Sequence, residues 1–482
     1  MLNLLHRNPI WPFFIDITKI PRPSKHEEQM VAYLVSWAHQ HNVSVQTDSV
    51  GNVLYSIPAT SGCEDSSPIT LQAHIDMVCE KNANVNHDFL ADPIPAYVDG
   101  NWLRSHGTTL GADDGIGVAT ALAIISEGQQ GRLAHAPLYC LFTVDEETGL
   151  TGAYNVKPEF LPSSQLINLD SEDEGQIFIG CAGGCTTTAQ FELLTEPTPA
   201  GMLGIKITLG GLLGGHSGGD IHLGRANALK LMARFVALAA DRCDLRLASF
   251  NAGNLHNAIA REALVEAAIP MAQKENLRVE FNVFLSSLHE EYDGIEPNID
   301  FDFETTDCPI SLFTSDLQNR FIGSLLACPH GVLAMHPTIA ALVQTSTNLA
   351  SVRTSPAEGI RIVTSQRSSA QSGIEYASQA VAAAFKLAKA KVLTNEGYPG
   401  WSPNLHSPIL HKAVSAYQKL FQVEPQVLAI HAGLECGLFA SKKQGMDMIS
   451  VGPTLRAVHS PDEAVDIDSV DKFWSFIKEL VK

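Results

Sequence analysis

Residues 137–149 read PLYCLFTVDEETG, an apolar run that ends in three consecutive carboxylates. A nearly continuous apolar run of this length is typical of a β-strand buried on both faces, as in the centre of a parallel sheet. Residues 165–169 (QLINL) have the same character, and residues 69–78 (ITLQAHIDMV) alternate apolar and polar side chains as a strand does. Between these runs, residues 115–127 place apolar side chains at helical spacing. Strands that alternate with helices predict an α/β fold with a mostly parallel sheet.

Two breaks in composition divide the chain. One lies in the Thr- and Pro-rich stretch 195–201, and the other lies in the stretch 395–400 (NEGYPG). The chain is also too long for one ordinary hydrophobic core. We therefore expect a discontinuous catalytic domain formed by residues 1–187 and 398–482, with a second domain, residues 188–397, inserted into it.

The inserted region contains a weak internal repeat. A strand-like segment at 205–209 precedes an amphipathic helix at 228–238, and a strand-like segment at 360–364 precedes a helix at 374–388. The repeat predicts an α+β domain of two similar halves.

Composition excludes several classes of partner. The net charge is −20, from 52 acidic and 32 basic residues, and such a surface repels nucleic acid and anionic membranes. No run approaches the roughly 18 apolar residues of a membrane span, and the N-terminus lacks the pattern of a signal peptide. The nine cysteines are odd in number and contain no CxxC, which indicates reduced thiols in a reducing compartment. We expect a cytoplasmic protein.

Five segments carry side chains that could bind a metal ion. In the first, His74 and Asp76 lie two residues apart on the predicted strand, so both face the same side, roughly 6.6 Å apart. A metal-bound histidine needs an acceptor at its other ring nitrogen, commonly a carboxylate, and Asp76 could supply it. A buried structural histidine is the competing interpretation.

The second segment, GADDGIG at 111–117, leads directly into a predicted helix. Aspartate is common as a helix N-cap. An N-cap does not require two adjacent aspartates between glycines, so Asp113 and Asp114 are also candidate ligands.

The remaining segments follow predicted strands. Asp145, Glu146 and Glu147 come after the apolar run that opens this section, Asp170 follows the strand at 165–169, and His459 follows a strand-like segment at 448–451. Open α/β sheets bind ligands at the carboxyl ends of their strands. Three adjacent carboxylates would repel one another unless a cation lay between them, although a solvated acidic turn is the simpler alternative.

Taken together, the candidates form a set of two imidazoles and several carboxylates. Mixed nitrogen and oxygen ligands suit Zn²⁺, Co²⁺ or Mn²⁺. Five ligands exceed the need of one tetrahedral ion and fit two ions that share a carboxylate.

The order and spacing of these segments resemble the M20 family of zinc peptidases, in particular its aminoacyl-histidine dipeptidase branch, also called cytosolic non-specific dipeptidase. The resemblance rests on eight strings between residues 71 and 463: LQAHIDMV, GTTLGADDGIGVA, FTVDEETGLTGA, INLDSEDEG, GGHSG, IVTSQRSS, HAGLECG and VGPTLRAVHSPDE. They extend over most of the chain.

The resemblance implies roles for the residues of the first and last parts of the chain. His74 and Asp170 would bind one zinc ion, Glu147 and His459 the other, and Asp113 would bridge the two. Asp76 would orient His74, and Glu146 would act as general base. The peptide bond after the bridging aspartate, Asp113–Asp114, would be cis.

The resemblance also implies that the inserted domain is a lid. His216 would polarise the scissile carbonyl, Arg367 would bind the C-terminal carboxylate of the substrate, and Asn257 would line the same pocket. Ala260 stands where the family often has proline, which weakens the assignment of Asn257.

These observations predict a two-zinc dipeptidase that acts on small dipeptides, with the homodimer of its family as the expected assembly. A lid of two halves could instead supply within one chain what other members obtain from a partner subunit. The alternatives are an N-acyl amino acid deacylase or broader aminopeptidase of the same fold, and an inactive metal-binding module.

Overall fold

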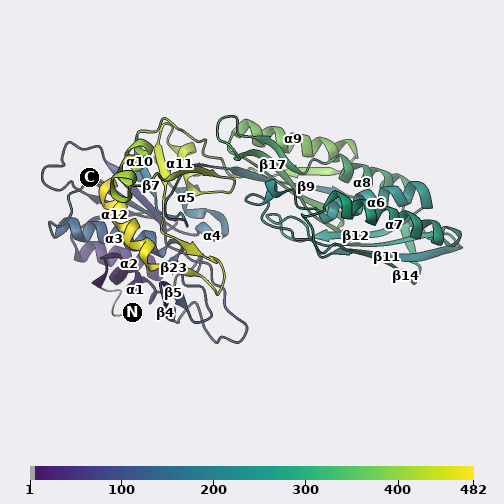
Figure 1. Ribbon diagram of the computed structural model, residues 1–482, viewed down its shortest axis with the longest axis horizontal. Helices are drawn as coiled ribbons and strands as arrows, with labels where there is room; N and C mark the ends of the chain where they lie inside the picture. Colours follow the sequence, from purple (N-terminus) through teal and green to yellow (C-terminus); the bar gives the residue numbers. More distant parts are fainter. Residues whose placement is uncertain (1–5) are drawn as a thin grey trace. The chain divides into compact units, whose positions relative to one another are not determined.

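The computed structural model describes residues 6–482 and divides them into two compact units (Figure 1). Unit 1 consists of the described residues up to Cys181 together with Trp401–Ala429 and Leu434–Lys482, and unit 2 consists of Ala182–Gly400 and Ile430–Gly433. The first five residues of the expected catalytic domain lie outside the described part.

The observed divisions differ from the expected ones in detail. Unit 2 begins at Ala182 rather than at residue 188, because strand β9 (Gly183–Phe191) belongs to its sheet. The Thr- and Pro-rich stretch near residue 195 is no boundary, since β10 (Thr195–Pro197) pairs with β15 (Ser311–Phe313) inside the same unit. The return of the short segment Ile430–Gly433 to unit 2 was not foreseen.

Unit 1 is built on an eight-stranded sheet. Its strand order is β1 (Ser44–Thr47), β2 (Val53–Ile57), β6 (Leu138–Thr143), β3 (Ile69–His74), β7 (Gln165–Asn168), β21 (Asp447–Ser450), β8 (Gln176–Cys181) and β20 (Gln426–Ile430). The central neighbours β6, β3, β7 and β21 are parallel, whereas β1–β2, β2–β6 and β21–β8 are antiparallel. The sheet is therefore mixed, and the expectation of a mostly parallel sheet holds only for its centre.

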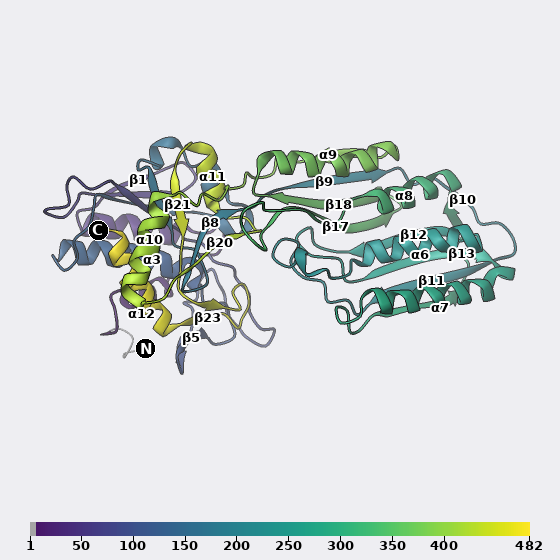
Figure 2. The same cartoon turned by 45° about the horizontal axis from the view of Figure 1, so that its top comes forward.

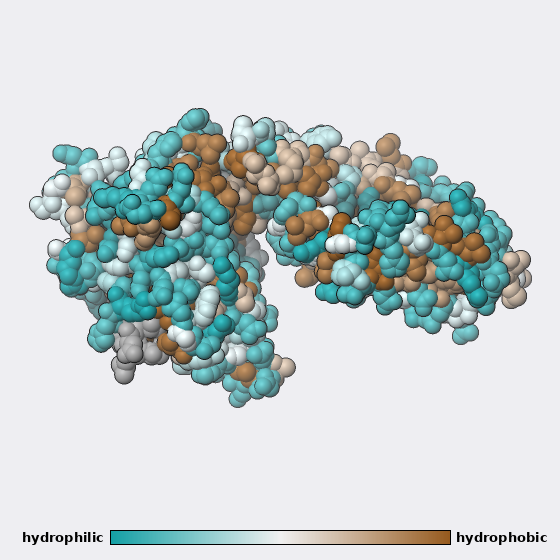
Figure 3. Space-filling model, viewed as in Figure 1, coloured by the Kyte–Doolittle hydropathy of each residue, from teal (hydrophilic) through white to brown (hydrophobic). Residues whose placement is uncertain are grey.

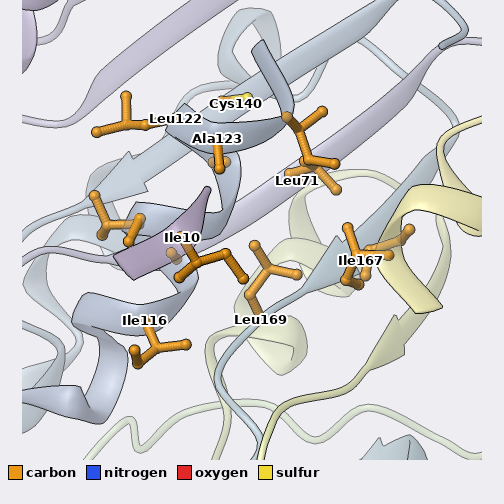
Figure 4. Close-up of a cluster of buried hydrophobic side chains, with 14 of the residues drawn as sticks. Ile10, Leu71, Ile116, Leu122, Ala123, Cys140, Ile167 and Leu169 are labelled. Atoms are coloured by element: carbon orange, nitrogen blue, oxygen red, sulfur yellow. The ribbon is translucent and has the colours of Figure 1, made fainter. Parts of the chain in front are cut away.

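The centre of this sheet is buried on both faces, as its apolar sequence predicts. Every residue of β3 is buried. Figure 4 shows Leu71 and Ile167 from adjacent strands together with Leu122 and Ala123 from helix α3 (Ala112–Gln129) in one cluster of buried side chains. Strand β3 ends at His74, four residues before the expected end, so Asp76 lies in the segment that follows the strand.

The other elements of unit 1 surround this core. The helices are α1 (Ile10–Ile17), α2 (Glu28–Gln40), the short α4 (Glu146–Gly149) and α5 (Thr151–Asn155), α10 (Pro408–Phe421), α11 (Glu435–Lys442) and α12 (Ile467–Leu480). A small sheet has the order β22 (Leu455–Arg456), β23 (Ala464–Asp466), β5 (Trp102–Ser105) and β4 (Ala96–Asp99).

Unit 2 is built on a nine-stranded sheet whose paired strands are antiparallel. The order is β14 (Asp300–Thr306), β11 (Met202–Gly210), β13 (Ala263–Pro270), β12 (Arg246–Gly253), β17 (Val343–Ser355), β18 (Gly359–Ser368), β9 and β19 (Lys391–Thr394), and β16 (Gly331–Met335) pairs with β17. Figures 1 and 2 show the four long helices on one face of it: α6 (Ala228–Cys243), α7 (Lys274–Glu291), α8 (Ser315–Ala327) and α9 (Gln371–Leu387). The two expected strand–helix pairs are β11 with α6 and β18 with α9, and they share this one sheet.

The sequence also makes predictions about the helices, the cysteines and the surface. No helix within residues 6–482 has the length and apolar character needed to cross a membrane. All nine cysteines are free thiols. On the face drawn in Figure 3, hydrophilic residues cover most of unit 1, and hydrophobic residues gather in patches on unit 2.

Candidate metal centre

Three parallel strands of unit 1 bring the candidate residues together. His74 is the last residue of β3, the turn Asp145–Glu147 follows β6, and Asp170 follows β7. Because β6, β3 and β7 are adjacent and parallel, their carboxyl ends meet at one edge of the sheet. The strand register thus carries residues that are almost 100 positions apart in sequence to one site.

The two adjacent aspartates at the start of α3, Asp113 and Asp114, have different hydrogen-bond partners and therefore different roles. Neither has helical backbone angles, and the peptide bond between them is cis, as the family resemblance implied. Asp114 Oδ1 accepts a hydrogen bond from the backbone N–H of Gly117 at 3.1 Å, so Asp114 caps the helix. Asp113 instead directs its carboxylate to the two histidines.

Asp113 lies between two groups of potential ligands. Its Oδ1 is 3.0 Å from Nε2 of His74, which in turn is 3.4 Å from Oδ1 of Asp170. Its Oδ2 is 3.1 Å from Nε2 of His459, which in turn is 2.9 Å from Oε2 of Glu147. The two oxygens of one carboxylate therefore serve two separate groups, His74–Asp113–Asp170 and Asp113–Glu147–His459.

The spacing of the donor atoms fits metal binding. Ligands about 2.0–2.1 Å from a tetrahedral Zn²⁺ lie roughly 3.3 Å from one another. The four distances around Asp113 run from 2.9 to 3.4 Å. Both groups can thus enclose an ion without a large movement of the side chains.

The buried carboxylates of this centre also favour the binding of a cation. Burial raises the pKa of Glu147 above its ordinary value and the pKa of Asp170 well above it, in spite of the neighbouring imidazoles. Hydrogen bonds from His459 and His74 outweigh the effect of burial on Asp113 and lower its pKa. A pair of divalent cations would compensate these carboxylates and leave the imidazoles neutral.

Asp76 connects His74 to the acidic turn. Its Oδ1 lies 3.3 Å from Nδ1 of His74 and accepts the backbone N–H of Glu146 at 3.0 Å. Its Oδ2 accepts the backbone N–H of Glu147 at 3.2 Å and the hydroxyl of Ser24 at 2.8 Å. The buried carboxylate therefore orients the imidazole and holds the turn that carries both glutamates.

Glu146 lies beside the candidate ligands. Single donor atoms of Glu146, Glu147 and His74 all lie within 4.8 Å of one another. Burial raises the pKa of Glu146 well above its ordinary value, with the charges of Asp170 and Glu147 adding to the effect. A carboxylate in such surroundings has a raised proton affinity, as a general base needs, and a nearby cation would lower its pKa again.

A further acidic cluster, Glu27, Asp76 and Asp145, is fully buried next to this turn. Glu27 Oε1 accepts the backbone N–H groups of Lys25 and Asp145 at 2.8 and 3.0 Å. Asp145 accepts the hydroxyls of Thr148 and Thr151. Because donors of the protein already bind most of these oxygens, the cluster stabilises the turn.

The remaining predicted site residues lie in unit 2. His216 Nδ1 accepts the backbone N–H of Gly219 at 3.0 Å, which places the proton of a neutral ring on Nε2. Burial, with the charges of Arg367 and His256, lowers the pKa of His216 and favours this neutral form. The ring is thus prepared to donate one hydrogen bond from Nε2.

Arg367 on β18 is buried, although a surface position was the alternative. Its Nη1 donates to the hydroxyl of Tyr398 at 2.9 Å, and its Nε makes no hydrogen bond among residues 6–482. Within the same residues no carboxylate lies within 4 Å of the guanidinium. A buried cation without an anionic partner is costly, so this arginine is suited to an anionic ligand.

Asn257 is exposed and lies beside the His216 loop. Its backbone carbonyl accepts the N–H of Ser217 at 2.7 Å, and Ala258 forms an isolated bridge with His216. The backbone thus brings Asn257 next to His216. Within residues 6–482 its side chain makes no hydrogen bond to the protein.

Three buried charged residues of the centre were not expected from sequence. Glu463 accepts four backbone N–H groups next to Asp113. Glu435 accepts hydrogen bonds from Gln72 and Thr143 beneath His74, and burial raises its pKa to about 7. Arg22 is bonded to the backbone at Asp76 and Gly111. The first two lie in the strings VHSPDE and HAGLECG, but nothing in one sequence distinguishes their carboxylates from surface ones.

Comparison with known proteins identifies the family. Residues 70–482 match the model of peptidase family M20/M25/M40. The chain is 42% identical over 481 residues to the cytosol non-specific dipeptidase of Escherichia coli (strain K12), with 100% of this chain and 98% of the relative covered. It superimposes with a TM-score of 0.90 on the aminoacylhistidine dipeptidase of Vibrio alginolyticus, also 42% identical, covering 98% of this chain and 96% of that one.

A more distant structure shares the fold alone. An aminopeptidase from Bacillus cereus gives a TM-score of 0.58 at 15% identity, with 99% and 98% of the two chains covered. The match of the family model over most of the chain and the high identity of the full-length relatives agree with the arrangement of residues around Asp113. The chain belongs to peptidase family M20/M25/M40.

Proposed function

We propose that this peptidase is a two-metal dipeptidase. The observation that carries the proposal is the position of Asp113, whose two carboxylate oxygens contact the imidazoles of His74 and His459 at 3.0 and 3.1 Å. A carboxylate in this position can bridge two ions, as two-metal hydrolases require. The substrate class follows from the two relatives at 42% identity, both of which are named as dipeptidases.

The ligand sets follow from the same geometry. His74 and Asp170 would hold one ion, Glu147 and His459 would hold the other, and Asp113 would contribute to both sites. Imidazole and carboxylate donors together favour Zn²⁺, with Co²⁺ or Mn²⁺ as substitutes. When bound, such a pair supplies Lewis acidity and lowers the pKa of a coordinated water to about 7.

Glu146 performs the proton transfers of the proposed mechanism. Its carboxylate accepts a proton from the attacking water and later delivers it to the nitrogen of the leaving amine. The hydrogen bonds that Asp76 accepts from the turn keep Glu146 and Glu147 in distinct positions. One glutamate is then available as a base while its neighbour acts as a ligand.

We further propose that unit 2 is the lid predicted from the sequence and that its residues act on the substrate. His216 donates a hydrogen bond from Nε2 to the oxyanion that develops on the scissile carbonyl. Arg367 binds the C-terminal carboxylate of the dipeptide, and Asn257 lines the same pocket. This carboxylate lies one residue beyond the cleaved bond, so its recognition restricts cleavage to the last peptide bond of a substrate.

A comparison of three substrates tests the proposal. Protein purified without chelator should contain close to two equivalents of metal and should release amino acids from a dipeptide faster than from an N-acetyl amino acid or a tetrapeptide. Faster cleavage of the acetylated substrate would identify a deacylase, and faster cleavage of the tetrapeptide a broader aminopeptidase. Absence of all three activities in the metal-loaded protein would identify an inactive metal-binding module.

The proposal extends to location and assembly. A cytoplasmic location agrees with nine free thiols and with the cytosolic name of the E. coli relative. A homodimer agrees with the apolar residues Val279 and Val283, which are 58% and 59% exposed one turn apart on α7. Sedimentation should give twice the 52.0 kDa mass of the chain, and a monomer at micromolar concentration would contradict the dimer.

A further inference from the structure

The carboxylate of Glu463 binds the backbone just before and at the bridging aspartate. Its Oε2 accepts the N–H groups of Leu110 and Gly111 at 2.7 and 2.9 Å. Its Oε1 accepts those of Ala112 and Asp113 at 2.8 and 3.3 Å. The side chain is 2% exposed, so one buried carboxylate satisfies four consecutive N–H groups from a segment 350 residues away in sequence.

The backbone of this segment explains why four donors converge. Gly111 has φ +71°, in the left-handed region, and successive N–H groups in such a turn point towards one anion. A Cβ atom at Gly111 would lie 2.5 Å from Nη2 of Arg22 and 2.8 Å from Sδ of Met77. A side chain at this position would be strained and would displace Arg22 or Met77. Without the carboxylate of Glu463, the four donors would be buried and unsatisfied.

Arg22 holds the same segment from the other side. Its guanidinium donates to the carbonyl of Gly111, and to those of Ile75 and Asp76 at 3.1 and 2.7 Å. The turn before Asp113 is thereby tied to the segment that follows His74. The positive charge of Arg22 also interacts with the buried charge of Glu463, which lowers the cost of burying both.

Glu463 lies four residues after His459, in the same loop between β22 and β23. Its own N–H donates to the carbonyl of Ser460 at 3.0 Å, which closes a turn in this loop. His459 has φ +60° and a side chain that is 51% exposed, so few contacts of its own hold it in place. The carboxylate of Glu463 thus connects the loop of one metal-ligand candidate to the loop of the bridging candidate.

We propose that Glu463 is a positioning residue of the metal centre, which fixes the distance between Asp113 and His459. This inference rests on the proposed two-metal function. A bridging carboxylate must place both oxygens within a few tenths of an ångström, and residues that orient ligands typically change metal affinity by 10–100-fold when they are replaced. Loss of the Glu463 contact should therefore weaken in particular the binding of the ion that Asp113, Glu147 and His459 would hold, which we expect to be the second equivalent to bind.

The decisive variant is Glu463→Gln, which keeps the shape of the side chain but turns one oxygen into a donor that faces N–H groups. The matched control is Glu296→Gln in unit 2. Glu296 is also buried, at 5% exposure, and accepts the N–H groups of Leu213 and Ala226 at 2.8 and 2.9 Å. Both variants lose the same kind of backbone contact, but only one lies at the metal centre.

The measurement is a titration of metal-free protein with Co²⁺ in competition with a chelator, followed by the visible absorption of the bound ion. The parent and Glu296→Gln should bind two equivalents alike. In Glu463→Gln the second equivalent should bind about 10–100-fold more weakly, with a changed absorption spectrum. Thermal unfolding of the metal-free proteins, measured in parallel, separates this effect from a loss of stability.

The outcomes distinguish the inference from the proposed function. A parent that binds only one equivalent contradicts the two-metal function itself. A Glu463→Gln protein with parental affinity for both equivalents overturns the positioning role, even if it is less stable. Should this variant be insoluble, Glu463→Asp replaces it, because its shorter carboxylate cannot reach all four N–H groups, and parental affinity there would overturn the inference equally.

Discussion

Glu146 and Glu147 are adjacent in sequence, but we propose different roles for them, a general base and a metal ligand. Glu147 Oε2 lies 2.9 Å from Nε2 of His459, in the group around Asp113, whereas Glu146 lies in the group that it forms with His74 and Glu147. Both backbone N–H groups bind the same carboxylate of Asp76, which explains how two neighbours keep fixed and separate positions. Substitution of each residue should therefore have its own signature.

Glu146→Gln should retain two metal equivalents and lose at least about 10²-fold in kcat, the lower end for general-base catalysis, because an amide cannot take up the proton. Glu147→Ala should instead lose metal, because it removes a ligand. Elemental analysis together with kcat on one dipeptide separates the two. A Glu146→Gln enzyme with nearly parental activity would show that the base lies elsewhere.

Arg367 should contribute through the carboxylate of the substrate. Arg367→Ala should lower kcat/KM for a dipeptide. The fall should correspond to a loss of about 1.5–3 kcal/mol of transition-state stabilisation, the range for a hydrogen bond to a charged group. The corresponding dipeptide amide should be a poor substrate of the parent and should lose little more in the variant.

The control for this experiment is Arg361→Ala on the same strand, β18, where the side chain is exposed. It should leave kcat/KM for both substrates unchanged. If Arg367→Ala lowers the rates for acid and amide equally, the arginine supports folding or closure of unit 2 and does not recognise the carboxylate.

At the scale of elements, two adjacent aspartates at the start of helix α3 have separate roles. Asp114 caps the helix, and Asp113 is the proposed bridging ligand. Asp114 accepts the N–H of Gly117, while Asp113 contacts two histidines. Asn at position 114 can still accept this hydrogen bond, so Asp114→Asn should retain both metals and the stability of the parent. Asp113→Asn should lose at least one metal equivalent, since an amide offers one oxygen in place of two.

Metal analysis and thermal unfolding of these two variants test the division. Asp114→Ala serves as the control for the cap and should cost about 1 kcal/mol of stability, the typical loss on removing an N-cap. Loss of metal from Asp114→Asn, with retention in Asp113→Asn, would reverse the assignment of the two aspartates.

At the scale of the whole molecule, all candidate ligands belong to unit 1. A metal that binds only the folded unit stabilises that unit by mass action, by about 4 kcal/mol when its free concentration is 1,000 times Kd. Calorimetry should therefore resolve a transition that moves to lower temperature on addition of chelator and returns on addition of Zn²⁺.

Unit 2 supplies the internal control for this measurement. With its own hydrophobic core, unit 2 should unfold in a transition that chelator leaves in place. A single transition that moves as a whole with metal would show instead that the two units unfold cooperatively.

Much of the architecture could be predicted from periodicity and from motifs. The apolar runs at 137–144 and 165–169 predicted the buried strands β6 and β7, because burial on both faces leaves little room for polar residues. The edges of the sheet were less predictable, since whether a flanking strand runs parallel or antiparallel depends on the path of the chain between strands. The boundary at Ala182 also escaped prediction, because β9 resembles the strands of either unit.

What the sequence determined by itself was the set of chemical groups: two imidazoles and several carboxylates at strand ends, in an order typical of M20 peptidases. Only the tertiary structure decided their arrangement. Asp113 meets His459 across 346 positions of sequence, and the carboxylate of Glu463 reaches four N–H groups across a similar interval. Local spacing determines which residues share a face of a strand, but contacts of this range arise from the packing of the whole unit. A glutamate whose carboxylate binds buried backbone N–H groups cannot be distinguished in the sequence from a glutamate that faces solvent. Only the burial and the hydrogen-bond partners of the side chain in the folded protein distinguish the two.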